Sequence, residues 1–170
     1  MSKRLAALGA AFLLAAASQA AAQAATAPHP NTRSTMRNDV SLELLGKSAL
    51  YTFAYQRMIT PAFGLEVGVS ALGGSTSSGG NSTVVFVPLG AKMYVIPKDG
   101  SLFLTGGINI VTATFSDGPF SDTGSGTFGY AGLGFEFRSS GGFMIRGTAY
   151  GLFASGDYFI WPGLTVGYAF

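Results

Sequence analysis

Apolar residues alternate one by one with small or polar residues in segment after segment of this chain. In residues 62–72, for example, Leu65 and Val67 are apolar, whereas Glu66 and Gly68 between and after them are charged or small. Successive side chains of a β-strand point to opposite faces. Each such segment therefore has one bulky apolar face and one small or polar face, and the pattern predicts a chain built of β-strands.

The same alternation limits how the chain can meet a membrane. Apolar residues make up 48% of the sequence and charged residues only 11%, yet after residue 24 no apolar run approaches the roughly 20 residues that a spanning helix needs. Strands of a membrane β-barrel alternate lipid-facing and lumen-facing residues. A chain that is apolar overall but never continuously apolar is typical of such a barrel.

Eight segments carry the alternation and predict an all-β fold, an eight-stranded antiparallel up-and-down transmembrane β-barrel. An even number of strands places both termini on one side, as in single-chain bacterial barrels, and closure leaves no unpaired edge in lipid. If residues 40–59 formed one bent strand, the number would fall to seven. The predicted strands cover residues 39–46, 49–59, 62–72, 83–96, 101–115, 125–138, 142–154 and 159–170.

Short turns and longer loops alternate between these strands. Short periplasmic turns and longer outer loops are the rule in outer-membrane barrels, so the longer loops at 73–82 and 116–124 are predicted to be the exposed contact regions. Two connections, at 46–48 and 155–158, are short although they fall on the outer rim. The short turns are predicted at 60–61, 97–100 and 139–142.

Residues 1–24 have the pattern of a secretory signal peptide. A basic start and an apolar stretch precede the small residues Ala22 and Ala24 of a cleavage site. Residues 25–38 lack periodicity and are expected to form a flexible leader. Residues 39–170 are then a single barrel domain.

Charge and cysteine usage exclude several classes of function. The sequence has 10 Lys and Arg and 8 Asp and Glu, and loss of Lys3 and Arg4 with the signal peptide makes the two numbers equal. No basic surface for nucleic acid remains. The chain has no cysteine, which excludes a disulfide framework and thiolate metal ligands.

Few ionisable residues lie within the predicted strands, and five of them share the face opposite the bulky apolar residues. A Lys or Arg facing lipid at the bilayer midplane costs roughly 2–4 kcal/mol, so we expect these side chains to point inward. An eight-stranded barrel is just wide enough to be filled by side chains. We therefore predict a structural ion-pair network in the lumen rather than a catalytic site or an open pore. Its members are Glu43, Glu66, Lys92, Glu136 and Arg146.

No other motif indicates catalysis, a cofactor or a metal. The barrel enzymes that use serine or an activated water rely on a histidine, and the only histidine, His29, lies in the expected leader. Gly46-Lys47-Ser48 is similar to the end of a phosphate-binding loop, but Ser41 stands where that motif needs a glycine, so a tight turn is predicted. We expect no catalytic, cofactor-binding or metal-binding residues and no enzymatic activity.

Two stretches carry a resemblance to known proteins. They are Ser41 to Gly46 running into Leu50 to Arg57, and Trp161 to Phe170. They resemble the small eight-stranded outer-membrane β-barrel proteins, the group that includes the transmembrane domain of the OmpA family, and a group of bacterial outer-membrane barrels without assigned activity. The resemblance implies a Gram-negative outer membrane reached by signal-peptide-dependent export, with outer-membrane lipids as partners.

The end of the second stretch is similar to the signal that the barrel assembly machinery reads. The resemblance implies that this machinery is a partner during insertion. The residues concerned are Leu164, Val166, Tyr168 and Phe170.

The expected role is structural or surface-interacting, through the longer loops. Two alternatives stay open. In one, the barrel binds or passes a small hydrophobic ligand or lipid. In the other, the chain is a soluble secreted barrel of lipocalin type, whose apolar face lines the inside. The sequence indicates no oligomeric state.

Overall fold

The computed structural model describes residues 31–75, 80–96, 98–117, 120–154 and 157–170. The predicted signal peptide, residues 1–24, and the first part of the expected leader lie outside these ranges. Among the described residues, no helix is long and apolar enough to cross a membrane.

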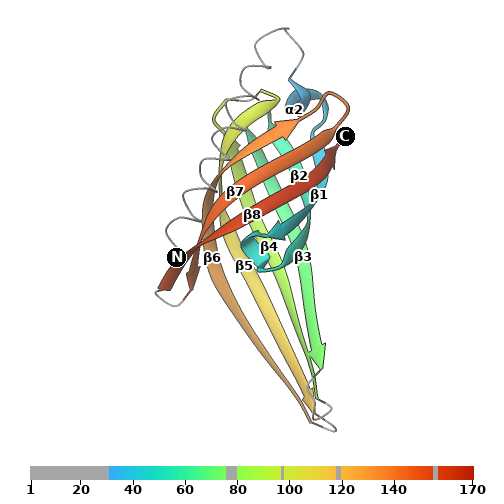
Figure 1. Ribbon diagram of the computed structural model, residues 1–170, viewed down its shortest axis with the longest axis vertical. Helices are drawn as coiled ribbons and strands as arrows, with labels where there is room; N and C mark the ends of the chain where they lie inside the picture. Colours follow the sequence, from blue (N-terminus) through green and yellow to red (C-terminus); the bar gives the residue numbers. More distant parts are fainter. Residues whose placement is uncertain (1–30, 76–79, 97, 118–119, 155–156) are drawn as a thin grey trace, which may run out of the picture.

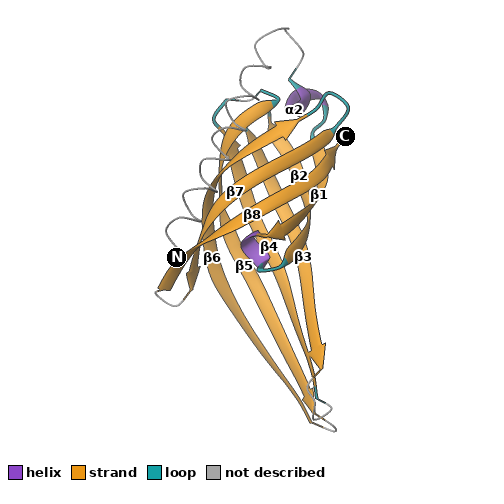
Figure 2. Cartoon of the chain, viewed as in Figure 1, coloured by secondary structure: helices purple, strands orange, loops and turns teal. Residues whose placement is uncertain are grey.

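Eight antiparallel strands close into one barrel, in which each strand pairs with its neighbours in sequence and the first pairs with the last. Reciprocal backbone hydrogen bonds between Asn38 and Phe170 complete the closure, at 3.0 and 2.8 Å. Figures 1 and 2 show the arrangement. The strands are β1 (Asn38–Leu45), β2 (Tyr51–Thr60), β3 (Phe63–Ser75), β4 (Asn81–Tyr94), β5 (Gly100–Asp117), β6 (Phe120–Arg138), β7 (Phe143–Ala154) and β8 (Asp157–Ala169).

The predicted fold class is confirmed, including the strand number. A 3-10 turn, η1 (Gly46–Ser48), separates β1 from β2. The two strands pair with each other, from Asn38 opposite Arg57 to Leu44 opposite Tyr51. Residues 40–59 are therefore two strands and not one bent strand.

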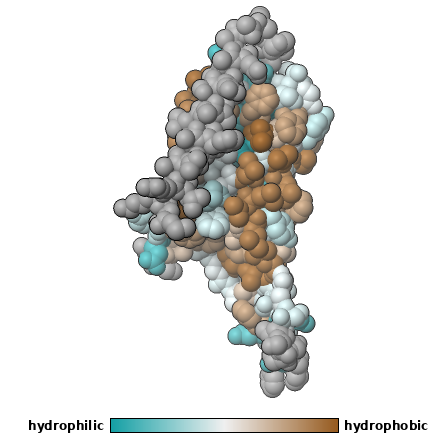
Figure 3. Space-filling model, viewed as in Figure 1, coloured by the Kyte–Doolittle hydropathy of each residue, from teal (hydrophilic) through white to brown (hydrophobic). Residues whose placement is uncertain are grey.

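The alternation in the sequence becomes an apolar exterior and a polar interior. On β3, Leu65 and Val67 are 50% and 44% exposed, whereas Glu66 between them is 5% exposed. All eight strands contribute large exposed apolar side chains to the outer face. Figure 3 shows apolar residues gathered across the middle of the barrel on the face in view. Soluble proteins rarely expose apolar patches larger than a few hundred Å². The alternative of a lipocalin-type barrel is therefore wrong, because it requires the opposite facing.

Two predicted loops are largely strand. Residues 116–124 were expected to be a polar loop, but β5 continues to Asp117 and β6 starts at Phe120, and the two residues pair. The predicted loop 73–82 is likewise shorter, because β3 extends to Ser75 and β4 begins at Asn81. These residues have no buried face, and cross-strand hydrogen bonds alone hold them extended.

The extended parts of β3 to β6 form a sheet that projects beyond the rest of the barrel, as Figure 1 shows at its lower end. The projecting sheet consists of residues 70–75, 81–86, 111–117 and 120–128. Its β6 edge has no neighbour, since β6 pairs with β7 only from Gly129 onward. Its β3 edge is open too, since β3 pairs with β2 only as far as Val69.

The described part of the expected leader differs from a flexible segment. Asn38 already belongs to β1, and residues 31–37, here called the N-terminal cap, lie at the barrel end where the C-terminus also lies (Figure 1). The cap contains one helical turn, α2 (Thr32–Thr35), in which the backbone N–H of Arg33 donates to the side chain of Asn31. Thr32 donates to Asp99 Oδ1 at 2.8 Å, and Arg37 O accepts from Met58 N at 2.7 Å.

Candidate functional site: the charged lumen and the projecting sheet

The five ionisable residues predicted to face inward are buried in the lumen. Each comes from a different strand, and none is more than 5% exposed. Lys92 pairs with Glu66, and Arg146 pairs with Glu136 and lies 3.8 Å from Glu66. Glu43 joins the group through Lys47. The structure thus brings all five into one continuous ion-pair network.

Two further strand residues belong to this network. Asp39 accepts from Arg146 Nη2 at 3.0 Å and from Arg138 Nη2 at 2.9 Å, and Arg138 Nε also lies 3.2 Å from Glu136. Sequence analysis did not assign either residue to the lumen. The signal was present, because Asp39 has the parity of Glu43 on β1 and Arg138 has the parity of Glu136 on β6.

Lys47 enters the lumen from the end of the barrel that carries the projecting sheet. The predicted tight turn is the 3-10 turn η1, and it folds into the barrel, so that Lys47 Nζ lies 2.7 Å from Glu43 and 3.0 Å from Glu66. Asn109 on β5 donates to the carbonyl of Lys47 at 2.7 Å. Leu45, which precedes the turn, has φ 60°, and such backbone is kept only where its surroundings compensate the strain.

Arg33 enters from the opposite end, on the N-terminal cap. Its Nη2 lies 2.8 Å from Glu136, and its guanidinium lies 4.3 Å from the centre of the Tyr94 ring. The side chain is fully buried. No periodicity could reveal Arg33 or Lys47, because neither lies in a strand. A buried cation on a non-strand segment therefore closes each end of the lumen.

The network leaves none of its carboxylates without a cation. Its four carboxylates are held by five cations, so that each carboxylate has at least one within 4 Å. Tyr94 and Tyr150 add hydrogen bonds to Glu136 and Glu43, at 2.7 and 2.6 Å. A general base must be able to accept a proton from a substrate, and carboxylates engaged in this way serve structure. Among the described residues, no group of three or more His, Cys, Asp or Glu is placed to hold a metal ion.

Aromatic rings fill the part of the lumen next to the ion-pair network, on the side of the projecting sheet. A Cβ atom added at Gly90 would collide with the Tyr130 hydroxyl, and one added at Gly107 would lie 2.7 Å from the same oxygen. Tyr130 thus lies directly against the backbone of β4 and β5, and its ring is 5.9 Å from that of Tyr150. This packing opposes the alternative that a ligand passes through or binds in the lumen at this level.

The predicted insertion residues lie on the outer face of β8 and at its end. They are between 45% and 54% exposed, and β8 is paired along both sides, with β1 and β7. Their recognition by the assembly machinery stays a prediction. The residues are Leu164, Val166, Tyr168 and Phe170.

The projecting sheet is the second feature with chemistry of its own. Residues 121–127 of its β6 edge are all exposed, and a Cβ atom added at Gly124 or Gly126 would meet nothing within 4 Å. Such an edge offers unpaired backbone N–H and C=O groups to another chain. Its described charged residues are Asp117 and Asp122, with no Lys or Arg among them.

Comparison with known proteins gives a fold and no sequence family. No family model matches the chain, and no curated protein matches its sequence. Among solved structures, the N-terminal β-barrel domain of Pseudomonas aeruginosa OprF is similar, with a TM-score of 0.56, 15% identity, and coverage of 79% of this chain and 96% of that chain. Ail, the attachment invasion locus protein of Yersinia pestis, in complex with the heparin analogue sucrose octasulfate, matches with a TM-score of 0.50, 15% identity, and coverage of 78% and 92%. The chain therefore has the fold of the small eight-stranded barrels, as the resemblance in its sequence implied.

Proposed function

We propose that this chain is an integral outer-membrane barrel that presents its projecting sheet at the cell surface as a contact surface. The observation that carries the proposal is the contrast between a lumen whose carboxylates are all ion-paired and an extended sheet with two open edges. Aromatic rings and ion pairs occupy the lumen, so we expect no route for solutes through the barrel centre. Outside the apolar belt, the projecting sheet exposes residues 121–127 along its β6 edge.

The outward apolar side chains of all eight strands support the membrane location. A band of this kind is what the lipid-facing wall of an outer-membrane barrel requires. The N-terminal cap and Phe170 share one end with the short turns, and the projecting sheet lies at the other end (Figure 1). By the asymmetry of such barrels, the sheet faces the outside of the cell.

The charge of the projecting sheet limits its partner. Ail, the attachment invasion locus protein, was crystallised with a sulfated heparin analogue. The projecting sheet of this chain carries Asp117 and Asp122 and no described basic residue, so we expect no sulfated polyanion there. Backbone pairing with a protein strand suits its open edges better.

Surface labelling of intact cells tests the orientation. One variant carries an epitope after Gly124 in the projecting sheet, and a matched variant carries the same epitope after Gly141, in the turn between β6 and β7. We expect antibody to label the first on intact cells and the second only after the outer membrane is permeabilised. Labelling with the opposite preference would overturn the orientation.

Adhesion tests the contact role. In one variant, removal of residues 112–127 shortens the β5–β6 hairpin. The barrel wall remains, because the buried lumen residues of β5 and β6 lie outside this range. Cells that express this variant should adhere less to one another and to protein-coated surfaces than cells that express the full chain. If both kinds of cell adhere equally, the contact role is wrong. If cells without the protein are in addition more sensitive to detergent, a structural role in the outer membrane remains.

A further inference from the structure

The outer wall of the barrel contains a hollow that the proposed function does not use. It has a volume of about 690 Å³ and crosses four neighbouring strands, β8, β1, β2 and β3. Two rungs of paired residues line it on the outer face, including Val40 between Tyr55 and Tyr168, and Leu42 beside Phe53. Apart from the two tyrosine hydroxyls, these side chains are hydrocarbon. Here the hollow is called the outer groove.

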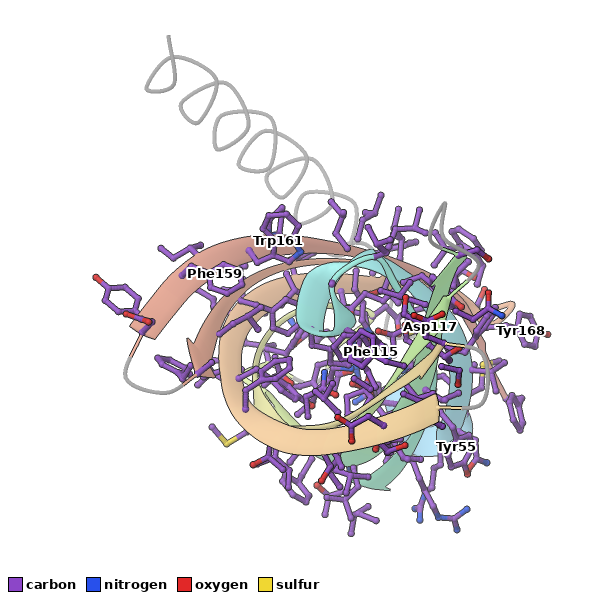
Figure 4. All side chains as sticks on the ribbon, turned by 90° about the horizontal axis from the view of Figure 1, so that it is seen from below. Tyr55, Phe115, Asp117, Phe159, Trp161 and Tyr168 are labelled. Atoms are coloured by element: carbon purple, nitrogen blue, oxygen red, sulfur yellow. The ribbon has the colours of Figure 1, made fainter. Side chains whose placement is uncertain are left out.

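The end of the outer groove nearer Phe170 and the N-terminal cap is polar. The next rung in that direction pairs Asn38 of β1 with Arg57 of β2. Tyr55 Oη donates to Asn38 Oδ1 at 2.7 Å, and Arg57 Nη1 donates to the same oxygen at 3.1 Å. A phenol, a carboxamide and a guanidinium thus meet at the mouth of an apolar groove. Figure 4 shows Tyr55 and Tyr168, one from each side of β1, pointing away from the barrel.

Arg57 differs from every other basic residue of the described strands. Lys92, Arg138 and Arg146 point into the lumen and are paired with carboxylates. Arg57 points outward and is exposed, and no described carboxylate lies within 4.0 Å of it. A guanidinium has five N–H donors and binds phosphate oxygens in a bidentate manner. Arg57 therefore has N–H donors free to bind an anion from outside the chain.

We propose that the outer groove binds one phospholipid of the leaflet on the side of the N-terminal cap and Phe170, with an acyl chain in the groove and the phosphate on Arg57. The proposal rests on the membrane location in the proposed function, since only a bilayer supplies this ligand at this face. Val40, Leu42 and Val67 give the acyl chain branched hydrocarbon to pack against. The positive charge of Arg57 complements the phosphate. Arg57 belongs to the third residue pair from the end of β2, which places it near the level of the lipid headgroups.

Native mass spectrometry of the full protein in detergent tests the site with two probes of equal acyl chains, phosphatidylglycerol and phosphatidylcholine. We expect one phosphatidylglycerol per chain to be retained in a saturable manner, with phosphatidylcholine bound more weakly. Arg57→Gln should weaken phosphatidylglycerol binding about tenfold, since it removes a charged hydrogen-bonding group. Lys98→Gln, at an exposed cation in the turn between β4 and β5, is the matched control and should leave the affinity unchanged.

A second pair of variants tests the acyl-chain part of the site. Val67→Trp fills the groove and should weaken binding of both lipids, whereas Leu104→Trp on the outer face of β5 should not. Both positions face outward, and a band that shifts on heating in unboiled gels shows that each variant is folded. Unchanged binding by Arg57→Gln and Val67→Trp would overturn the site, as would a second copy of the chain seated on the groove in place of lipid.

The two proposals fail in different ways. If the purified chain stays dissolved without detergent, the membrane location fails and the lipid site fails with it. If the chain needs detergent but its lipids are non-saturable and indifferent to both variants, only the lipid site fails.

Discussion

The two halves of β6 follow different rules, although one continuous strand contains both. From Gly129 to Arg138 the strand alternates between buried residues such as Tyr130 and Glu136 and exposed apolar residues such as Leu133. From residue 121 to residue 127 every side chain is exposed. Residues 129–138 pair with β5 and β7, whereas residues 120–128 pair with β5 alone.

The comparison shows what fixes each region. In residues 129–138, burial decides which face a side chain takes, and an unsuitable residue leaves an unpaired charge or a steric clash inside the barrel. In residues 120–128, only the hydrogen-bond ladder with β5 holds the strand, and side chains can be substituted at little cost. Lumen substitutions should therefore cost stability, and matched substitutions in the projecting sheet should cost little.

The largest expected effect follows from removing one charge at the centre of the network. Glu136 is fully buried and pairs with Arg33, Arg138 and Arg146. Glu136→Gln keeps the size of the side chain but leaves these cations undercompensated, and should lower the free energy of unfolding by about 3–5 kcal/mol. Denaturant unfolding of the detergent-solubilised barrel measures it.

Asp122→Asn in the projecting sheet is the matched control for this change. Its side chain is exposed and makes no described ion pair, so the loss should stay within about 0.5 kcal/mol. Equal effects of the two variants would remove the distinction between the two halves of β6.

Glycine substitutions should show the same contrast with a smaller effect. A Cβ atom at Gly107 would overlap the carbonyl of Leu89 and press on the Tyr130 hydroxyl, whereas one at Gly124 would meet nothing within 4 Å. Gly107→Ala should destabilise the barrel by about 1–3 kcal/mol, since backbone must move. Gly124→Ala should be neutral or stabilising by up to about 1 kcal/mol, because alanine restricts the unfolded chain. Thermal unfolding of both variants decides between these signs.

Much of the barrel wall follows from the sequence because burial imposes a period of two. The tip of the projecting sheet was predicted to be loop because Asp122 and Gly124 are poor strand formers and have no apolar face. They are extended because β5 continues beside them, so that each hydrogen bond formed supports the next. A local pattern contains no information about how far a partner strand runs.

The lumen network divides in the same way. Glu43 and Glu66 follow from parity, and Asp39, which already lies in the predicted strand 39–46, shares the parity of Glu43. Arg33 and Lys47 lie outside the strands and reach the lumen because buried carboxylates attract them. Their place depends on the assembled barrel, which the sequence pattern of their own segments does not indicate.

The N-terminal cap should respond locally rather than globally. Arg33→Gln removes the ion pair with Glu136 and the contact with the Tyr94 ring. The cap can then detach without opening the strands, so we expect backbone hydrogen exchange to rise in residues 32–36, by a factor that corresponds to about 1–2 kcal/mol. Arg37→Gln changes an exposed side chain of the same segment and should leave exchange unaltered. If the backbone amides of residues 32–36 exchange equally slowly in both variants, the buried guanidinium of Arg33 does not hold the cap in place.

The smallest expected effect concerns paired hydroxyl groups in the projecting sheet. Thr114 on β5 and Thr123 on β6 lie opposite each other with their hydroxyl oxygens 3.4 Å apart, and both are reachable by water at the sheet surface. Thr123→Ala should change the free energy of unfolding by less than about 0.5 kcal/mol, because water replaces the lost contact. Thr165→Ala, at a buried position of β8 facing the lumen, should cost more, since water cannot fill the space it leaves. Parallel denaturant curves measure the difference, and a larger loss at Thr123 would mean that the projecting sheet is held by its side chains and not by its ladder alone.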